Sequence, residues 1–183
     1  MKIIQIYILL LATALAPNIV IADQSDPRLD KLFFNLKVNA DLALSQQLTS
    51  EIWRIWSEHN KKDINVLFND GEIAIYRKEY ETALESFNQI VKLAPNFAEG
   101  WNKRATVYFL MGDYHASLAD IEETLRLEPR HFGALAGQGQ CYFELQKFQS
   151  ALNAFEKAFA VNPWLYDVYR NIEIMKKLLD QQT

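Results

Sequence analysis

Between residues 64 and 163, hydrophobic, small and polar positions recur at a fixed interval of 34 residues. Within each interval the apolar side chains fall three and four positions apart, which predicts two short amphipathic helices joined by a turn. A proline stands near the end of each interval. It is expected to end the second helix there, because proline biases the residue before it away from helical geometry. The pattern therefore predicts three stacked helical hairpins that share one continuous core. Matching positions hold Leu67, Trp101 and Leu135; Gly71, Ala105 and Gly139; Tyr80, Tyr114 and Phe148; Ala83, Ser117 and Ala151; Phe87, Ile121 and Phe155; Ile90, Thr124 and Ala158; and Pro95, Pro129 and Pro163.

The small residues of the pattern predict where the two helices of a hairpin approach closely. A glycine or alanine in the first helix stands opposite an alanine or serine in the second, while the aromatic and branched residues fill the space between successive hairpins. We therefore expect a leucine in place of Gly139 to force its hairpin apart.

The turns between paired helices differ in sequence. Gly112 and Asp113 suit the middle turn, since glycine accepts a left-handed backbone and aspartate can cap the following helix. The outer turns have Lys78 and Gln146 at the glycine position. A non-glycine residue held left-handed costs roughly 1 kcal/mol, so we expect the outer turns to adopt a different conformation.

This set of residues resembles the tetratricopeptide repeat (TPR), in three consecutive copies over Ile64 to Pro163. The resemblance implies an all-α fold, a right-handed superhelix with repeats at 64–97, 98–131 and 132–165. The middle copy is also similar to the central repeat of small exported bacterial TPR proteins. Departures from the family pattern are Ala74, Arg104 and Ser117.

Arg104 is the least expected of these departures, because it stands in a row of helix-packing residues. We expect its stem to pack and its guanidinium to pair with a carboxylate, either Glu99 or Asp70. A contact with a ligand is the alternative.

The segments on either side of the three repeats are predicted to cap the ends of the solenoid. Residues 23–63 predict two helices, the second capped by Asp41, and form a degenerate N-terminal repeat. Within this hairpin, Trp53 and Trp56 are expected to pack in the core, with a binding site as the alternative. Residues 166–183 form an amphipathic capping helix, for which membrane binding is the alternative.

The first 22 residues are typical of a secretory signal peptide, with one lysine, an apolar run and small residues before a cleavage point after Ala22. An uncleaved membrane anchor is the rival interpretation, although the run is shorter than the roughly 20 apolar residues that span a bilayer. Cleavage predicts an exported protein, periplasmic in a Gram-negative source, without stable membrane insertion. The remaining chain is acidic and lacks a basic footprint for nucleic acid.

No residue set predicts catalysis, a metal site or a cofactor. Asp113, His115 and Ser117 contain the residue types of a hydrolase triad, but helical side chains two apart do not converge. The three histidines share no helical face at the spacing of a metal site. The single cysteine, Cys141, is expected to be a buried and inert thiol.

The inner face of the solenoid is where we expect binding, because the resemblance implies a concave groove that takes an extended peptide or a helix. This face is predicted to be apolar with amides and acids, and without a basic residue. The predicted groove residues are Asn65, Phe68, Glu72, Tyr76, Glu99, Asn102, Thr106, Phe109, Gln140 and Phe143. The alternative for Phe109, Leu110 and Phe143 is packing between repeats.

A carboxylate clamp of the co-chaperone type is not predicted. The resemblance places its basic and amide residues at positions that here hold Phe68, Glu72, Lys103, Gly133 and Gly137, of which only the lysine is basic.

The function predicted from sequence is a non-catalytic scaffold in the cell envelope that binds an unidentified protein partner in the groove. One alternative is a structural subunit or assembly factor that uses the convex face or the N-terminal tryptophans. The other is an enzyme with an unrecognised site.

Overall fold

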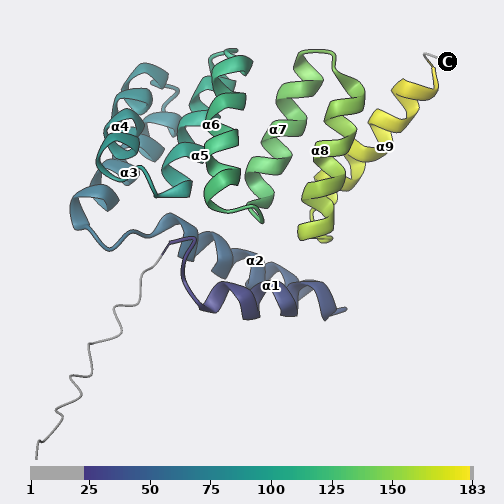
Figure 1. Cartoon of the computed structure of the whole chain (residues 1–183), viewed down its shortest axis with the longest axis horizontal. Coiled ribbons are helices and arrows are strands. Elements are labelled where there is room, and N and C mark those ends of the chain that lie inside the picture. Colours follow the sequence, from purple (N-terminus) through teal and green to yellow (C-terminus); the bar gives the residue numbers. More distant parts are fainter. Residues whose placement is uncertain (1–22, 182–183) are drawn as a thin grey trace, which may run out of the picture.

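The computed structural model describes residues 23–181, and this part of the chain is all-helical with nine helices (Figure 1). The predicted signal peptide, with its cleavage point after Ala22, lies outside the described residues, as do residues 182–183. The helices are α1 (Arg28–Val38), α2 (Leu42–Ser57), α3 (Lys62–Tyr76), α4 (Tyr80–Leu93), α5 (Ala98–Leu110), α6 (Tyr114–Leu127), α7 (Phe132–Glu144), α8 (Phe148–Val161) and α9 (Tyr166–Asp180).

Three antiparallel hairpins, α3–α4, α5–α6 and α7–α8, stand side by side in chain order and form the predicted superhelix (Figure 1). The close approach within a hairpin occurs at the predicted glycines, but their nearest partner is an aromatic ring of the paired helix and not the predicted alanine. A Cβ atom built on Gly71 would lie 2.6 Å from the ring of Phe87, and one built on Gly139 would lie 2.5 Å from the ring of Phe155. Each ring therefore occupies the space that the missing side chain leaves.

The three turns between paired helices share one conformation, so the prediction that the outer two differ is wrong. Lys78 and Gln146 adopt φ angles of 62° and 58°, beside 80° at Gly112. In each turn the following backbone N–H donates to a carbonyl five residues earlier, at 2.8–2.9 Å, as in a Schellman motif. Because these bonds satisfy carbonyls at the end of the first helix, they offset the roughly 1 kcal/mol of left-handed strain.

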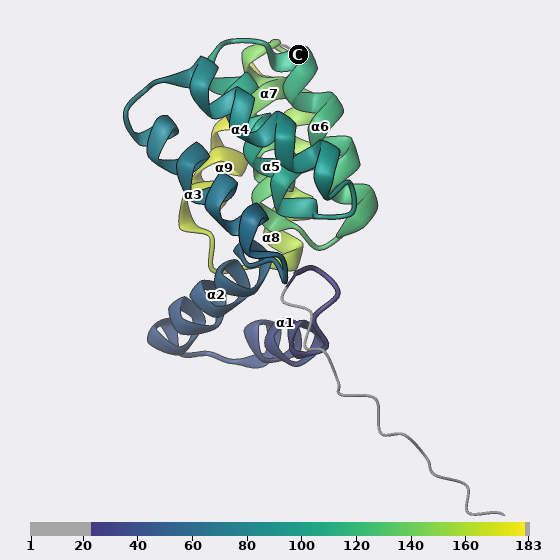
Figure 2. The ribbon, with the colours of Figure 1, turned by 90° about the vertical axis from the view of Figure 1, so that its left-hand side faces the viewer.

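The N-terminal hairpin α1–α2 forms where the sequence predicts it, but it does not stack in front of α3–α4 as an end cap. It lies across one edge of the solenoid, against the connectors that join successive repeats (Figures 1 and 2). The Trp164 indole donates to the Leu36 carbonyl at 3.1 Å, and the Asn162 amide donates to the Thr49 hydroxyl at 3.2 Å. Asp30 pairs with Arg130 at 2.6 Å.

Aromatic packing explains this placement of the hairpin. Trp56 is 1% exposed and stacks on His131 with 4.1 Å between ring centroids, and Phe132 lies 5.0 Å from the same indole. The two partners are neighbours at the start of α7, where His131 is the N-cap and Phe132 is the first helical residue. The prediction that Trp56 packs in the core is confirmed, although the core it joins also contains residues about 75 positions away in the chain.

Helix α9 covers the last hairpin with its apolar face, of which Val168, Ile172 and Met175 are buried. The helix begins at Tyr166, after a connector in which the Trp164 indole is bonded to α1. Among the described residues, no helix is both long enough and apolar enough to cross a membrane.

Candidate functional site

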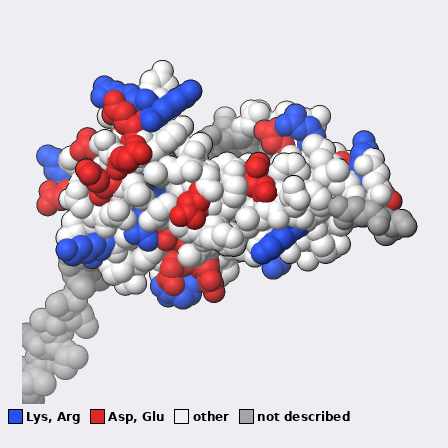
Figure 3. Space-filling view, turned by 90° about the horizontal axis from the view of Figure 1, so that it is seen from above, with Lys and Arg blue, Asp and Glu red and all other residues white. Residues whose placement is uncertain are grey.

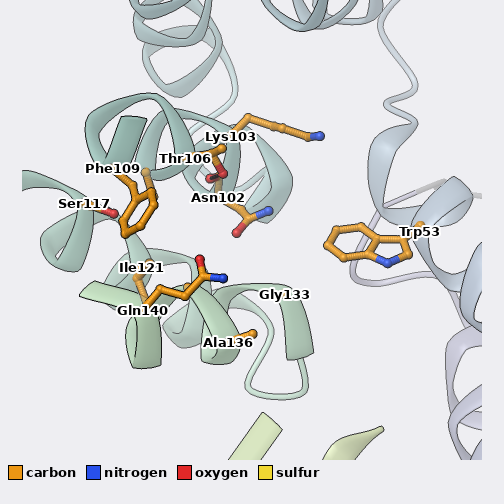
Figure 4. Close-up of a pocket in the computed structure, with 12 residues that line it drawn as sticks. Trp53, Asn102, Lys103, Thr106, Phe109, Ser117, Ile121, Gly133, Ala136 and Gln140 are labelled. Atoms are coloured by element: carbon orange, nitrogen blue, oxygen red, sulfur yellow. Dashed lines mark hydrogen bonds between the residues drawn. The ribbon is translucent and has the colours of Figure 1, made fainter. Parts of the chain in front are cut away.

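A hollow of about 220 Å³ lies between α5 and α7, and α2 supplies one of its walls (Figure 4). The indole of Trp53 faces the hollow from the side opposite Asn102 and Thr106. Gly133 is required for this wall, since a Cβ atom there would overlap the Trp53 ring. The lining consists of Trp53, Asn102, Lys103, Ala105, Thr106, Phe109, Ser117, Ile121, Gly133, Ala136, Gly137 and Gln140.

A second hollow, of about 280 Å³, continues the first one toward α9 and shares Phe109 and Gln140 with it. Phe143 and Ile174 are 39% and 41% exposed at this hollow, which is more than a core side chain would be. We call the two hollows together the central groove. The second hollow is lined by Phe109, Gln140, Phe143, Glu144, Phe155, Asn171, Ile174 and Met175.

A buried hydrogen-bond network orients one polar group of the groove. The Nδ1 atom of His131 accepts a bond from the Ala134 backbone N–H at 3.0 Å, so the neutral ring carries its proton on Nε2. Nε2 donates to Glu99 Oε2 at 2.8 Å, and the Asn102 amide nitrogen donates to the same oxygen at 3.1 Å. A carboxylate only accepts, so Asn102 must turn its nitrogen toward Glu99 and its carbonyl oxygen away from it.

Lys103 is the basic residue of the groove, and two carboxylates flank it. Its ammonium lies 2.7 Å from Glu72 and 3.7 Å from Glu99. Burial by itself would lower the pKa of Lys103, but the two negative charges outweigh burial and raise its pKa. The lysine therefore stays charged, and its charge is compensated within the protein.

The predicted groove residues fall into two groups. Five line the central groove as expected, namely Asn102, Thr106, Phe109, Gln140 and Phe143. Glu72 borders it through its ion pair with Lys103. The carboxamides of Asn102 and Gln140 both point into the hollow (Figure 4).

The other four predicted residues do not line the groove. Phe68 is 2% exposed because it packs in the core of the first hairpin, edge-on against Phe87 and 6.0 Å from the Phe97 ring. Glu99 is buried and serves the network with His131. Asn65 bonds the backbone of His59 at 2.9 and 2.7 Å and so closes the α2–α3 connector. Tyr76 is 89% exposed at the end of α3, outside the groove.

Sequence reasoning missed two groove residues. Lys103 contradicts the prediction of a face without a basic residue, and its position one helical turn after Glu99 was a usable signal. For Trp53 the sequence predicted core packing, with a binding site only as the alternative. The side chain packs partly buried beside the core of the N-terminal hairpin and also lines the first hollow, because the fold of that hairpin brings it to α5 and α7.

Arg104 has a structural role with a partner other than the two predicted. Its guanidinium forms a two-pronged pair with Asp120 at 2.7 and 2.8 Å and donates to Asn88 at 2.9 Å. Its charge also lies over the ring of Trp101, at 4.9 Å. Glu99 is unavailable because it belongs to the His131 network, and Asp120 is within reach from α6. Arg104 thereby joins α5 to α6 and α4.

The residues with catalytic potential are placed as core or surface groups. Ser117 is buried and accepts a bond from the Cys141 thiol at 3.3 Å, while His115 is exposed. Burial raises the pKa of the Cys141 thiol, which disfavours the reactive thiolate. Within residues 23–181, no cluster of three or more histidine, cysteine, aspartate or glutamate side chains has the geometry of a metal site.

Sequence comparisons identify relatives of this chain. A family model described as anaphase-promoting complex, cyclosome, subunit 3 matches residues 76–158. A TPR repeat-containing protein of Rhizobium etli is 36% identical over 157 residues, which cover 83% of this chain and 77% of that protein. The small glutamine-rich tetratricopeptide repeat-containing protein 2 of Mycosarcoma maydis is 24% identical over 94 residues, which cover 51% of this chain and 27% of that protein.

Solved structures share the helical arrangement. The Sgt2 TPR domain of Aspergillus fumigatus superposes with a TM-score of 0.64 at 23% identity, over 67% of this chain and 82% of that domain. The first TPR of Spaghetti (RPAP3), bound to the HSP90 peptide SRMEEVD, superposes with a TM-score of 0.62 at 19% identity, over 64% of this chain and 93% of that one. At these identities the likeness concerns the fold.

Proposed function

Because this chain belongs to the TPR family, we propose that it is a non-catalytic scaffold that binds a peptide segment of a partner protein in the central groove. The observation that carries the proposal is the composition of that groove. Partly exposed apolar side chains, Phe143 and Ile174, lie beside the carboxamides of Asn102 and Gln140. Apolar contacts with a few convergent polar groups are what recognition of a peptide requires.

The carboxamide of Gln140 supplies the second polar group. It is exposed, and among the residues that the structure describes it has no hydrogen-bond partner. A primary amide can both donate to a peptide carbonyl and accept from a peptide N–H. The structurally similar RPAP3 domain, which binds an HSP90 peptide, supports a peptide as the ligand class.

We place this function in the cell envelope as part of the same proposal. Its support is the apolar run from Ile3 to Ala16 followed by small residues before position 22. Mass spectrometry of the N-terminus of the purified native protein tests it: a chain that begins at Asp23 is expected, and a retained Met1 in exported material would contradict cleavage.

Photo-crosslinking in cells tests the groove. A photoreactive amino acid at Thr106, which is exposed at the first hollow, is expected to capture a discrete partner protein. The matched control is Glu122, an exposed residue of α6 that does not line the groove. Capture from Glu122 but not from Thr106 would contradict binding in the groove.

A second candidate function, a structural subunit or assembly factor, is supported by a different surface. Phe34, Val38 and Leu42 of the N-terminal hairpin are 65%, 63% and 58% exposed, which is unusual for large apolar side chains. The predicted use of the N-terminal tryptophans does not support a separate surface, because Trp56 is buried and Trp53 lines the central groove. Crosslinking from Phe34 and not from Thr106 would favour this function.

A further inference from the structure

The charges of the central groove indicate which peptides it accepts. Its rim and lining contain one positive side chain, Lys103, and two negative ones, Glu72 and Glu144, and the buried Glu99 lies next to Lys103. Because Glu72 and Glu99 already compensate Lys103, no cation of the groove is left to attract an acidic ligand. Arg170 at the α9 end is also paired, with Asp167 at 3.2 Å.

Glu144 is the negative charge that is available to a ligand. It lines the second hollow beside Phe143 and Ile174, and it is exposed. Among the described residues, its carboxylate accepts only a long hydrogen bond of 3.5 Å, from the Tyr114 hydroxyl, and it has no basic partner. A basic side chain bound next to the apolar hollow would therefore gain an ion pair without breaking an existing one.

At the other end of the groove, the orientation of the Asn102 carboxamide also favours a hydrogen-bond donor or a cation over an acidic ligand. Its nitrogen is engaged by Glu99, which leaves its carbonyl oxygen as the acceptor turned toward the hollow. A peptide N–H or an ammonium can bind this oxygen, whereas a carboxylate would be repelled by it and by the buried Glu99.

The charged side chains on the face of the molecule seen in Figure 3 include both signs. Figure 3 shows acidic and basic side chains interspersed over the edge of the solenoid, with uncharged surface between them. Long-range attraction from that edge would therefore not override the local charges of the groove.

We propose that the central groove binds a peptide segment in which a lysine or arginine stands beside apolar side chains, and that it rejects acidic peptides such as SRMEEVD. The apolar side chains occupy the hollow lined by Phe109, Phe143 and Ile174, and the basic side chain pairs with Glu144. The peptide backbone bonds to Asn102 and Gln140. This inference rests on the proposed function and names the chemistry of the partner.

The test begins with a displayed library of random short peptides, selected on the full chain and counter-selected on a Gln140→Trp variant. Gln140 is exposed and lines both hollows, so the added indole is expected to block the central groove without disturbing the core. Circular dichroism and thermal unfolding confirm that each variant is folded. The selected peptides are then measured by fluorescence anisotropy beside labelled SRMEEVD.

We expect the selected peptides to combine apolar residues with lysine or arginine, and to bind more tightly than SRMEEVD. Glu144→Gln should weaken their binding about threefold at low ionic strength, as expected for an exposed ion pair. Glu144→Lys should weaken it further, and added salt should reduce the difference between variants. The matched control Glu122→Gln removes the same charge from α6 and should leave binding unchanged.

Two outcomes would overturn the proposal, and they are distinguishable. Selection of acidic peptides, or tighter binding by Glu144→Lys, would refute the basic and apolar partner while leaving a peptide-binding groove. Failure to select any peptide that the Gln140→Trp variant does not also bind would refute the groove itself, and with it the proposed function.

Discussion

Two glycines in α7 should respond to the same substitution with opposite signs. A Cβ atom at Gly139 would lie 2.5, 2.6 and 2.8 Å from three atoms of the Phe155 ring, distances at which something must move. The ring is 2% exposed and packs among α7, α8 and α9, so it can shift only toward the second hollow that it lines, at the expense of its core contacts. A Cβ atom at Gly137 would meet only the Ile121 side chain, at an ordinary 3.6 Å.

The expected magnitudes follow from two opposing effects on the free energy of unfolding. Replacing a mid-helix glycine by alanine stabilises a helix by about 1 kcal/mol. Gly137→Ala should retain most of this gain. At Gly139 the same gain is opposed by overpacking, which costs roughly 1–3 kcal/mol in a filled core. Gly139→Ala should therefore be destabilising by about 1 kcal/mol, and a leucine there by considerably more.

Thermal unfolding followed by circular dichroism separates the two cases. For a chain of this size, 1 kcal/mol corresponds to about 2–4 °C in Tm, so Gly137→Ala should raise Tm and Gly139→Ala should lower it. A second change, Phe155→Leu, should recover part of the loss at Gly139 because it removes the ring edge. If Gly139→Ala were as stable as Gly137→Ala, the close approach at Phe155 would be refuted.

Other changes test the remaining contacts. Arg104→Ala should cost about 3 kcal/mol in urea denaturation, because it leaves the buried Asp120 carboxylate unpaired; an added Asp120→Asn should restore part of the loss, and no recovery would argue against the pair. Lys78→Gly and Gln146→Gly should each raise Tm by relieving up to about 1 kcal/mol of left-handed strain, unlike a glycine placed elsewhere in the chain. The Cys141 thiol should react with a disulfide reagent only after unfolding, since burial raises its pKa; rapid reaction in the native protein would contradict this.

Much of the solenoid could be predicted from local sequence because its contacts are local. A 34-residue period with small residues at Gly71 and Gly139 is sufficient to predict hairpins that approach at those points, and the structure places Phe87 and Phe155 there. The turns show where this reasoning failed. Residue type alone suggested that Lys78 avoids the left-handed region, but hydrogen bonds at the end of α3 hold it there.

The residues of the central groove were predicted less completely than the hairpins. Helical periodicity indicates which face of a helix a residue occupies, but it does not indicate which other helix packs on that face. Phe68 and Phe109 stand on equivalent sides of α3 and α5, yet the first is buried against Phe87 and the second lines the groove. Glu99 also lies on the predicted face of α5, but its carboxylate is buried in a hydrogen bond with His131, 32 residues away.

The sequence alone therefore determined the repeat and its helical hairpins, since both depend on residues that are neighbours along the chain. Only the tertiary structure decided that α1–α2 crosses the connectors, that Trp53 forms a wall of the groove and that Lys103 is compensated by Glu72 and Glu99. These features join residues from different helices, and their geometry depends on how whole helices pack. The charge of the groove, and hence the partner we propose for it, follows from that packing.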